Sequence, residues 1–284
     1  MTFITRFAPS PTGHLHLGHA YSALYAKQCA EEQGGRFLLR IEDIDPERCK
    51  KKYEVELLED LKWLGLNWPS PVRRQSEHLD DYANALAKLQ NMGLLYPCFC
   101  SRKDVRAEIA SAGYAPHDAP QGLEGPLYPG TCRNLSSTEQ LSRTASGAPF
   151  ALRFKTDIAL QITGPLTWHD QLTGTQVATP EKFGDPVLAR KDTPTSYHLS
   201  VTVDDHIQGI TCVTRGQDLY SATHIHRLLQ ALLNLNTPTY HHHQLLTDNQ
   251  GQRYAKRNNS LTIRILRNEG HSAAAVREMA FANV

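Results

Sequence analysis

The sequence predicts an α/β protein with a Rossmann-like, doubly wound parallel sheet, and three observations predict it. Short β-prone runs alternate with helical patterns, a loop rich in proline and glycine joins the first strand to the first helix, and an acidic cluster follows the second strand. Alternation of this kind is typical of parallel strands covered by helices. The 284 residues suffice for one large domain or two smaller ones.

The expected elements follow from hydrophobic periodicity along the chain. We expect strands at residues 2–7, 37–41, 150–154, 199–203 and 210–214, and helices at 17–33, 53–64, 79–89 and 221–233. Between residues 96 and 147 the periodicity fades and glycine, proline, serine and cysteine become frequent, which indicates an irregular insertion. The predicted organisation is a first half of the sheet domain (1–95), an insertion (96–149), a second half (150–235), and a loop with a short helical tail (236–284).

The amino-acid composition excludes some classes of function. Lysine and arginine number 30 against 29 acidic residues, so the net charge of +1 excludes a uniformly basic nucleic-acid binder and leaves RNA contact to a local patch. No apolar run approaches the ~20 residues of a membrane span, and residues 1–6 lack the features of a signal peptide. We expect a cytoplasmic protein with no membrane partner, whose six cysteines are thiols or metal ligands rather than disulfides.

The loop after the first strand carries the first chemical signal. It reads Pro-Ser-Pro-Thr-Gly-His-Leu-His-Leu-Gly-His over residues 9–19 and opens a helix, whose N-terminus attracts phosphate through unpaired N–H groups. Gly13 and Gly18 allow a ligand to approach closely. His16 and His19 lie on one face, where both can donate hydrogen bonds to phosphate. The structural alternative is a turn followed by two exposed histidines, and the length of the string disfavours it.

Residues 6–19 resemble the signature of the class I glutamyl-tRNA synthetases, with His16-Leu17-Gly18-His19 in place of the family's His-Ile-Gly-His motif. The resemblance extends to residues 37–45, 197–205 and 209–219, and so covers nearly the whole chain. The chain ends soon after Lys256, which leaves no room for that family's helical anticodon-binding domain. In this truncation the sequence resembles a paralogous family, the glutamyl-queuosine tRNA(Asp) synthetases.

The resemblance implies ATP-dependent activation of L-glutamate to glutamyl-adenylate, with Mg²⁺ bound to the ATP. It also implies transfer of glutamate to queuosine in the anticodon loop of tRNA(Asp), carried out by a monomer. Three alternatives stand beside it. One is a minimal glutamyl-tRNA synthetase that charges a tRNA 3′ end, another is a glutaminyl-type specificity, and the third is a catalytically impaired module that binds nucleotide or RNA.

A pocket for glutamate needs cations for two carboxylates and an anion for one ammonium. Arg6 and Arg215 can each make paired hydrogen bonds to a carboxylate, Glu42 can accept from the ammonium, and Tyr197, expected at a strand end, adds a hydroxyl. By resemblance, the glutamate site is lined by Arg6, Phe7, Ala8, Pro9, Ser10, Glu42, Tyr197 and Arg215. For each charged residue the alternative is a structural ion pair.

By the same resemblance, ATP is bound by His16, Gly18, His19 and Lys256, with His16, His19 and Lys256 as the catalytic residues. The family's mobile Lys-Met-Ser-Lys-Ser loop is here Arg-Tyr-Ala-Lys-Arg over residues 253–257. Lys256 keeps the second lysine, a mobile point charge suited to a pyrophosphate leaving group. Ala255 lacks the hydroxyl of the family's serine. The spacing of these residues alone predicts only a solvated basic loop. The difference between this segment and the family's motif is the feature that favours the catalytically impaired alternative.

A structural zinc site is expected in the insertion. Cys98, Cys100 and Cys132 supply three thiolates, whereas structural zinc takes four ligands in a tetrahedron. By resemblance to the paralogous family, the fourth ligand is Tyr128, four residues before the last cysteine. His117 is an alternative fourth ligand of a commoner type, and reduced, buried cysteines without metal are the structural alternative.

The remaining histidines and cysteines are interpreted structurally. We expect His224 and His226, and the three consecutive histidines 241–243, to be loose surface residues. Packing is the expected role of Cys29, Cys49 and Cys212. The acidic residues beside the motifs are expected to cap or hold loops, namely Asp43, Asp45, Asp204 and Asp205.

Overall fold

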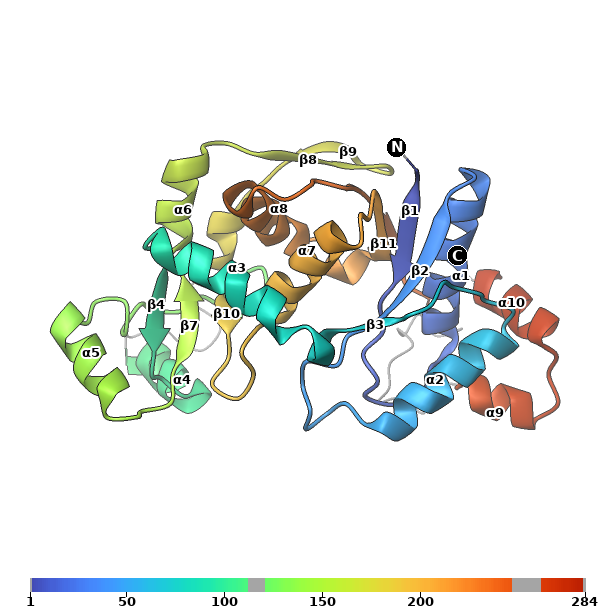
Figure 1. Cartoon of the computed structure of the whole chain (residues 1–284), viewed down its shortest axis with the longest axis horizontal. Helices are drawn as coiled ribbons and strands as arrows, with labels where there is room; N and C mark the ends of the chain where they lie inside the picture. Colours follow the sequence, from blue (N-terminus) through green and yellow to red (C-terminus); the bar gives the residue numbers. More distant parts are fainter. Residues whose placement is uncertain (1, 112–120, 247–261, 283–284) are drawn as a thin grey trace.

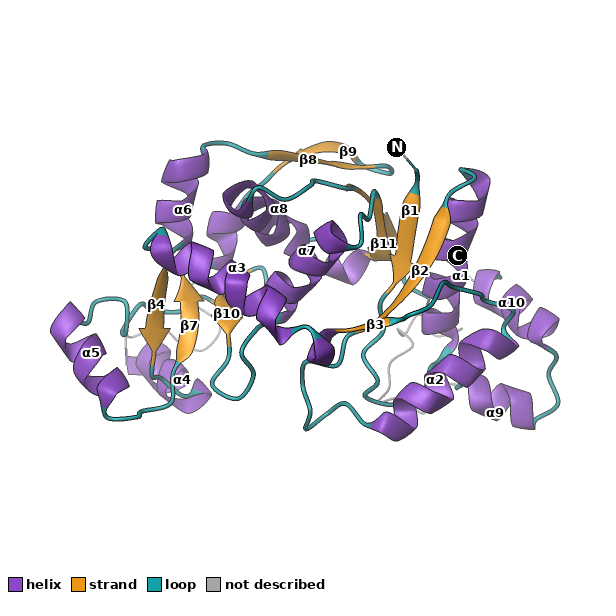
Figure 2. Cartoon of the chain, viewed as in Figure 1, coloured by secondary structure: helices purple, strands orange, loops and turns teal. Residues whose placement is uncertain are grey.

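The main sheet of the fold is parallel in the computed structural model, which describes residues 2–111, 121–246 and 262–282 (Figures 1 and 2). Strands β1 (Ile4–Phe7), β2 (Arg36–Ile41) and β3 (Arg73–Arg74) pair in parallel. A second group, β11 (Cys212–Gly216), β12 (Thr239–His243) and β8 (Thr167–Asp170), also pairs in parallel, with β9 (Gly174–Val177) antiparallel at its edge.

The two groups of strands meet at β1 and β11. The backbone N–H of Thr211 donates to the carbonyl of Ile4 at 3.0 Å, which places the start of β11 beside β1. From β1 the chain continues to β2 on one side, while β11 leads to β12 on the other. Such a reversal of strand order is the place where ligands bind in open α/β sheets. The predicted Rossmann-like parallel sheet is confirmed.

Helix α1 (Leu17–Glu32) packs directly on this sheet because one face of it is made of small residues. Ala20, Ala23, Ala26 and Ala30 are all buried. They allow a close approach, and the carbonyl of Ala26 accepts a 2.7 Å hydrogen bond from the Thr5 hydroxyl of β1. Three further helices cover the same core, α2 (Lys51–Trp63), α9 (Ile263–Asn268) and α10 (Ala273–Phe281).

A second core lies between helices at the middle of the molecule (Figure 1). It joins α3 (Leu79–Asn91), α6 (Thr156–Thr163), α7 (Tyr197–Ile207) and α8 (Ala222–Leu233) to an antiparallel sheet. That sheet has the order β10-β7-β4, with bounds Val187–Ala189, Ala151–Phe154 and Leu95–Cys98. Because β4 pairs with β7, the chain leaves this sheet and returns to it at neighbouring strands.

The segment between β4 and β7 has more regular structure than predicted. It contains α4 (Arg102–Ser111), the short hairpin of β5 (Gln121–Gly122) and β6 (Gly125–Pro126), and α5 (Ser137–Ala145). No residue of α5 is buried, so the helix leaves little hydrophobic signal in the sequence. Its start is instead fixed by a capping box in which Ser136 and Glu139 bond each other's backbone N–H groups.

The strand predicted at 199–203 is wrong, because these residues lie within helix α7. All residues from His198 to Asp205 are buried. Polar and apolar residues alternate from His198 to Asp204, so the sequence shows the two-residue periodicity of a strand. The strand predicted at 210–214 begins two residues later, at Cys212. Within the described part of the chain, no helix combines the length and apolar character that a bilayer crossing needs.

Candidate active site

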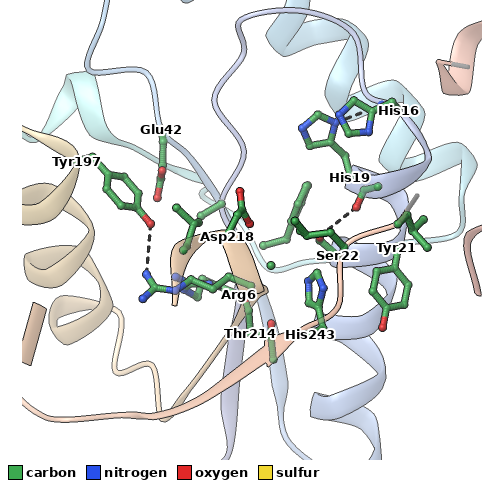
Figure 3. A pocket seen from close by; sticks show the side chains of 18 residues that line it. Arg6, His16, His19, Tyr21, Ser22, Glu42, Tyr197, Thr214, Asp218 and His243 are labelled. Atoms are coloured by element: carbon green, nitrogen blue, oxygen red, sulfur yellow. Dashed lines mark hydrogen bonds between the residues drawn. The ribbon is translucent and has the colours of Figure 1, made fainter. Parts of the chain in front are cut away.

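A cavity of about 250 Å³ opens at the carboxyl ends of β1, β2 and β11, where the strand order reverses (Figure 3). It brings together most of the residues predicted for glutamate and ATP, from four separate parts of the chain. These are Arg6, Phe7, Ala8, His16, Gly18, His19, Glu42, Tyr197 and Arg215. Glu42 and Tyr197 lie at one end of the cavity, and His16 and His19 lie at the other.

Two predicted glutamate residues lie outside this cavity. The carbonyl of Pro9 accepts a 3.0 Å hydrogen bond from the backbone N–H of Glu42, so Pro9 positions the chain beside the site. Ser10 lines a neighbouring cavity of about 300 Å³, which shares Glu42 and Tyr197 with the first. Tyr197 is the first residue of α7 and not the end of a strand as predicted.

The phosphate end of the cavity is built at the start of α1. His16 is the residue before the helix, and its backbone N–H donates to Nδ1 of His19 at 3.2 Å. The two rings lie with their centroids 3.8 Å apart. A Cβ atom at position 18 would lie 3.1 Å from the His16 ring, so Gly18 allows the two histidines this close arrangement.

Lys256 and the rest of the 253–257 segment lie outside the described residues, as does His117. The described chain on either side of that segment lies at the phosphate end. Leu246 lines the cavity, and Thr262 pairs with His16 in an isolated β-bridge. The N–H of Ile263 also donates to the Leu15 carbonyl at 2.9 Å.

The two arginines of the cavity differ in their partners. Arg6 is paired with Asp205, to which its Nε donates at 3.0 Å, and its Nη1 donates to the carbonyl of Thr214 at 2.9 Å. Arg215 is just as buried, with 6% of its surface exposed. In the described part of the chain, however, the acceptors of its hydrogen bonds are uncharged and no carboxylate forms an ion pair with it.

Glu42 is held in place by a fully buried neighbour. Arg40 donates to Glu42 at 3.1 Å and to Asp205 at 2.8 Å. Burial raises the pKa of Glu42, and the nearby guanidinium groups of Arg40 and Arg6 oppose this shift only in part. An ammonium group in the cavity would favour the charged carboxylate.

Of the acidic residues expected to hold loops, Asp43 and Asp204 do so, whereas Asp205 pairs with the strand residues Arg6 and Arg40. Asp204 accepts hydrogen bonds from Arg73 at 2.7 Å and from Gln75 at 2.8 Å. Asp43 accepts from the backbone N–H of Ser76 at 2.9 Å. These contacts tie the ends of β2 and β3 to α7 and so fix the walls of the cavity.

The prediction of loose surface histidines is wrong for three residues. His226, His242 and His243 are buried. Helix α8 lies in the second core. In β12, the ring of His242 packs against Trp168 and Tyr220, and the ring of His243 packs against Tyr21 of α1. His243 lines the cavity, together with Ser22 and Asp218, which sequence reasoning missed. Asp218 lies two residues after the end of β11, and its place near the carboxyl end of a strand is the signal in the sequence that could have identified it.

The four predicted metal ligands lie together beside β4. The sulfur atoms of Cys98, Cys100 and Cys132 are all within 4.8 Å of one another. The hydroxyl of Tyr128 lies 3.5 Å from the sulfur of Cys98 and 3.6 Å from that of Cys100. Three thiols and one phenol oxygen around a common centre are a donor set suited to a tetrahedral zinc ion. The guanidinium of Arg153 lies 3.7 Å over the Tyr128 ring.

Comparison with known proteins identifies the family. A protein of Rhodobacter capsulatus named Glutamyl-Q tRNA(Asp) synthetase is 48% identical over 285 residues, which cover 97% of this chain and 99% of that protein. The glutamate–tRNA ligase of Aquifex aeolicus is 38% identical over 272 residues, and the match covers 96% of this chain but 55% of that enzyme.

A solved structure supports the same assignment. The crystal structure of a glutamate tRNA ligase from Elizabethkingia meningosepticum in complex with its amino acid has a TM-score of 0.79 and 26% identity to this chain. The match covers 99% of this chain and 60% of that one. The family model of the class I tRNA synthetase (E and Q) catalytic domain matches residues 2–281. The chain is therefore an enzyme of the class I tRNA synthetase family, in the group for glutamate and glutamine.

Proposed function

We propose that this enzyme activates L-glutamate with ATP and transfers the glutamyl group to queuosine in the anticodon loop of tRNA(Asp). We choose glutamate as the substrate because the cavity contains a cation and an anion that fit its side-chain carboxylate and its ammonium. Arg215 is a buried cation without a carboxylate partner among the described residues, and Glu42 is a carboxylate at the same end. Arg215 would bind the γ-carboxylate, and Glu42 would bind the ammonium.

In the first step, an oxygen of the α-carboxylate attacks the α-phosphorus of ATP, and pyrophosphate leaves. His16 and His19 lie where the phosphates would meet the N-terminus of α1, so they would donate to phosphate oxygens as charge develops. Lys256 would stabilise the leaving pyrophosphate. Mg²⁺, bound mainly through the phosphates, would neutralise the remaining charge.

In the second step, a hydroxyl of the acceptor attacks the carbonyl carbon of glutamyl-adenylate, which forms an ester and releases AMP. The adenylate is already activated, so no protein nucleophile is required. The proposal of queuosine as acceptor is supported by the name of the Rhodobacter capsulatus relative, which matches this chain over 99% of its length. We also propose that the enzyme acts as a monomer in the cytoplasm.

Zinc is the proposed structural metal, with one ion held by Cys98, Cys100, Cys132 and Tyr128. The support is the gathering of these four donor atoms beside β4. The ion would order the segment between β4 and β7. Its chemistry would be structural, because the three cysteines and Tyr128 would fill all four positions of a tetrahedral site.

The test is glutamate-dependent exchange between ATP and pyrophosphate without tRNA, with glutamine and aspartate as controls. Exchange with glutamate alone is expected, and Lys256→Ala is expected to abolish it. Transfer of labelled glutamate is then measured with tRNA(Asp) that carries queuosine and with the same tRNA carrying unmodified guanosine. Absence of exchange, with or without tRNA, would refute an active adenylating site.

A minimal glutamate–tRNA ligase is the second candidate. It is favoured by the 38% identity to the Aquifex aeolicus enzyme and by the fold shared with the Elizabethkingia structure. Labelling of tRNA(Glu) at its 3′ end, together with no labelling of queuosine-containing tRNA(Asp), would support this candidate and refute the first.

A further inference from the structure

A continuous chain of polar side chains runs through the core on both sides of Arg215. On one side, Nε of Arg215 donates to Nε2 of His242 at 3.0 Å, and Nδ1 of His242 lies 2.7 Å from Oδ2 of Asp170. On the other side, Nη1 of Arg215 lies 3.3 Å from Nδ1 of His226. The chain continues from Nε2 of His226 to Nδ1 of His198 at 3.2 Å.

The second branch ends at an exposed carboxylate. Nε2 of His198 lies 3.2 Å from Oε2 of Glu124, which belongs to the turn between β5 and β6. Glu124 therefore connects the segment that carries the thiol cluster to the arginine of the cavity. Every other member of the chain is buried.

The position of each proton follows from the fact that a guanidinium group can only donate hydrogen bonds. Nε2 of His242 and Nδ1 of His226 must both be unprotonated, since each faces Arg215. His242 then carries its proton on Nδ1 and donates to Asp170. His226 carries its proton on Nε2 and donates to His198, which in turn donates from Nε2 to Glu124.

Burial and the charge of Arg215 keep these rings neutral. Together they lower the pKa of His242 to about 3, although Asp170 opposes the shift. The same two causes hold the pKa of His226 well below its usual value. Asp170 is fixed as an acceptor, because its other oxygen receives the backbone N–H groups of Leu172 and Thr173 at 2.9 and 3.1 Å.

We propose that His242 and His226 are positioning residues for Arg215, and that Asp170 and Glu124 fix the ring protons that this role requires. The proposal rests on the proposed function, in which Arg215 receives the γ-carboxylate of glutamate. A carboxylate beside Arg215 would hold the guanidinium equally well but would neutralise it. Two neutral rings hold it by hydrogen bonds and leave its charge for the substrate.

Asp170→Asn tests this directly. The amide has only one acceptor oxygen, so its NH₂ group would face either the N–H groups of Leu172 and Thr173 or Nδ1 and the backbone N–H of His242. The second arrangement moves the ring proton to Nε2, where it opposes Arg215. We expect KM for glutamate to rise roughly tenfold to a hundredfold, with a smaller change in kcat and none in KM for ATP. The ratio of kcat/KM for glutamate over glutamine should fall.

The matched control is Tyr25→Phe. The hydroxyl of Tyr25 lies 2.7 Å from Nε2 of His241, so this variant also removes a histidine hydrogen bond from β12, but at a residue outside the cavity. Its KM for glutamate is expected to equal that of the wild type. Equal effects of the two variants would overturn the proposal, as would a folded Asp170→Asn protein with the wild-type KM for glutamate.

A second variant and a spectroscopic measurement decide the matter if Asp170→Asn does not fold. Glu124 is exposed, and Glu124→Ala is expected to raise KM for glutamate about fivefold, the equivalent of one hydrogen bond. An unchanged KM for glutamate in Glu124→Ala overturns the role of that branch.

Nitrogen-15 NMR of the histidine rings should show Nε2 of His242 unprotonated in the wild type, and a protonated Nε2 overturns the proposal. This NMR measurement does not depend on enzyme activity. A failure of the proposed function would be seen separately, as absence of ATP–pyrophosphate exchange in the wild type.

Discussion

Two buried arginines, one beside the cavity and one lining it, should lose very different amounts of stability on the same substitution. Arg40 and Arg215 are 0% and 6% exposed. Arg40 is paired with carboxylates of Glu42 and Asp205, whereas the hydrogen bonds of Arg215 go to uncharged acceptors. Comparison of Arg40→Gln with Arg215→Gln therefore separates a structural cation from a cation held for a ligand.

The magnitudes follow from the partners. Arg40→Gln removes a cation from the carboxylates of Glu42, Asp204 and Asp205, and breaking a buried pair costs about 3–5 kcal/mol. For a chain of this size, that corresponds to a fall in Tm of roughly 6–20 °C. Arg215→Gln loses four hydrogen bonds worth about 1 kcal/mol each. It also removes an uncompensated buried charge that costs several kcal/mol, so the net change in unfolding free energy is expected to stay within about 2 kcal/mol.

The assay is thermal and urea unfolding of both variants, with and without glutamate. Glutamate at a hundred times its Kd should stabilise the wild type by about 2.7 kcal/mol and should leave Arg215→Gln unchanged. A large loss of stability in Arg215→Gln, equal to that of Arg40→Gln, would show that Arg215 has a structural counter-charge. In that case Arg215 would be a structural cation and would not be held for the substrate.

Three further predictions concern the metal and two buried acids. Cys98→Ser is expected to lose the one equivalent of zinc that the wild type and Cys29→Ser retain, measured by elemental analysis. Because burial raises the pKa of Glu42, calorimetric affinity for glutamate should weaken as pH falls toward that pKa, and this dependence should vanish in Glu42→Gln. Burial also raises the pKa of Asp60 to about 6, so the folded state loses stability as pH rises from about 4 to 6; Asp60→Asn should raise Tm at pH 7 but not near pH 4.

Local sequence signals predicted the parts of the site that local structure builds. The strand, loop and helix around His16 and His19 form one continuous segment, so their spacing in the sequence is also their arrangement in space. The cysteine pair and the Tyr-x-x-x-Cys string were similarly informative, because each is a short segment whose side chains gather at one place.

The buried histidines could not be predicted in this way. His242 is buried because the rings of Trp168 and Tyr220 pack against it, and its pKa is lowered by this burial and by Arg215, which lies 27 residues away in the sequence. Helix α7 was mistaken for a strand for a related reason. Its residues from His198 to Asp205 are buried whether polar or apolar, so burial does not follow residue type and the 3.6-residue periodicity on which its prediction depends is lost.

The charges at the site explain why the environment of Arg215 matters more than its mere presence. Arg6 and Arg40 are paired with Asp205 and Glu42, and Arg73 is paired with Asp204 and Asp81, whereas the hydrogen-bond acceptors of Arg215 in the described part of the chain are uncharged. The side-chain carboxylate of glutamate would give Arg215 a charged partner, whereas the amide of glutamine would not. Aspartate has the right charge, but its side chain is one methylene shorter. Specificity for glutamate under the proposed function would therefore require both the free charge of Arg215 and its fixed position, and neutral histidines satisfy both requirements.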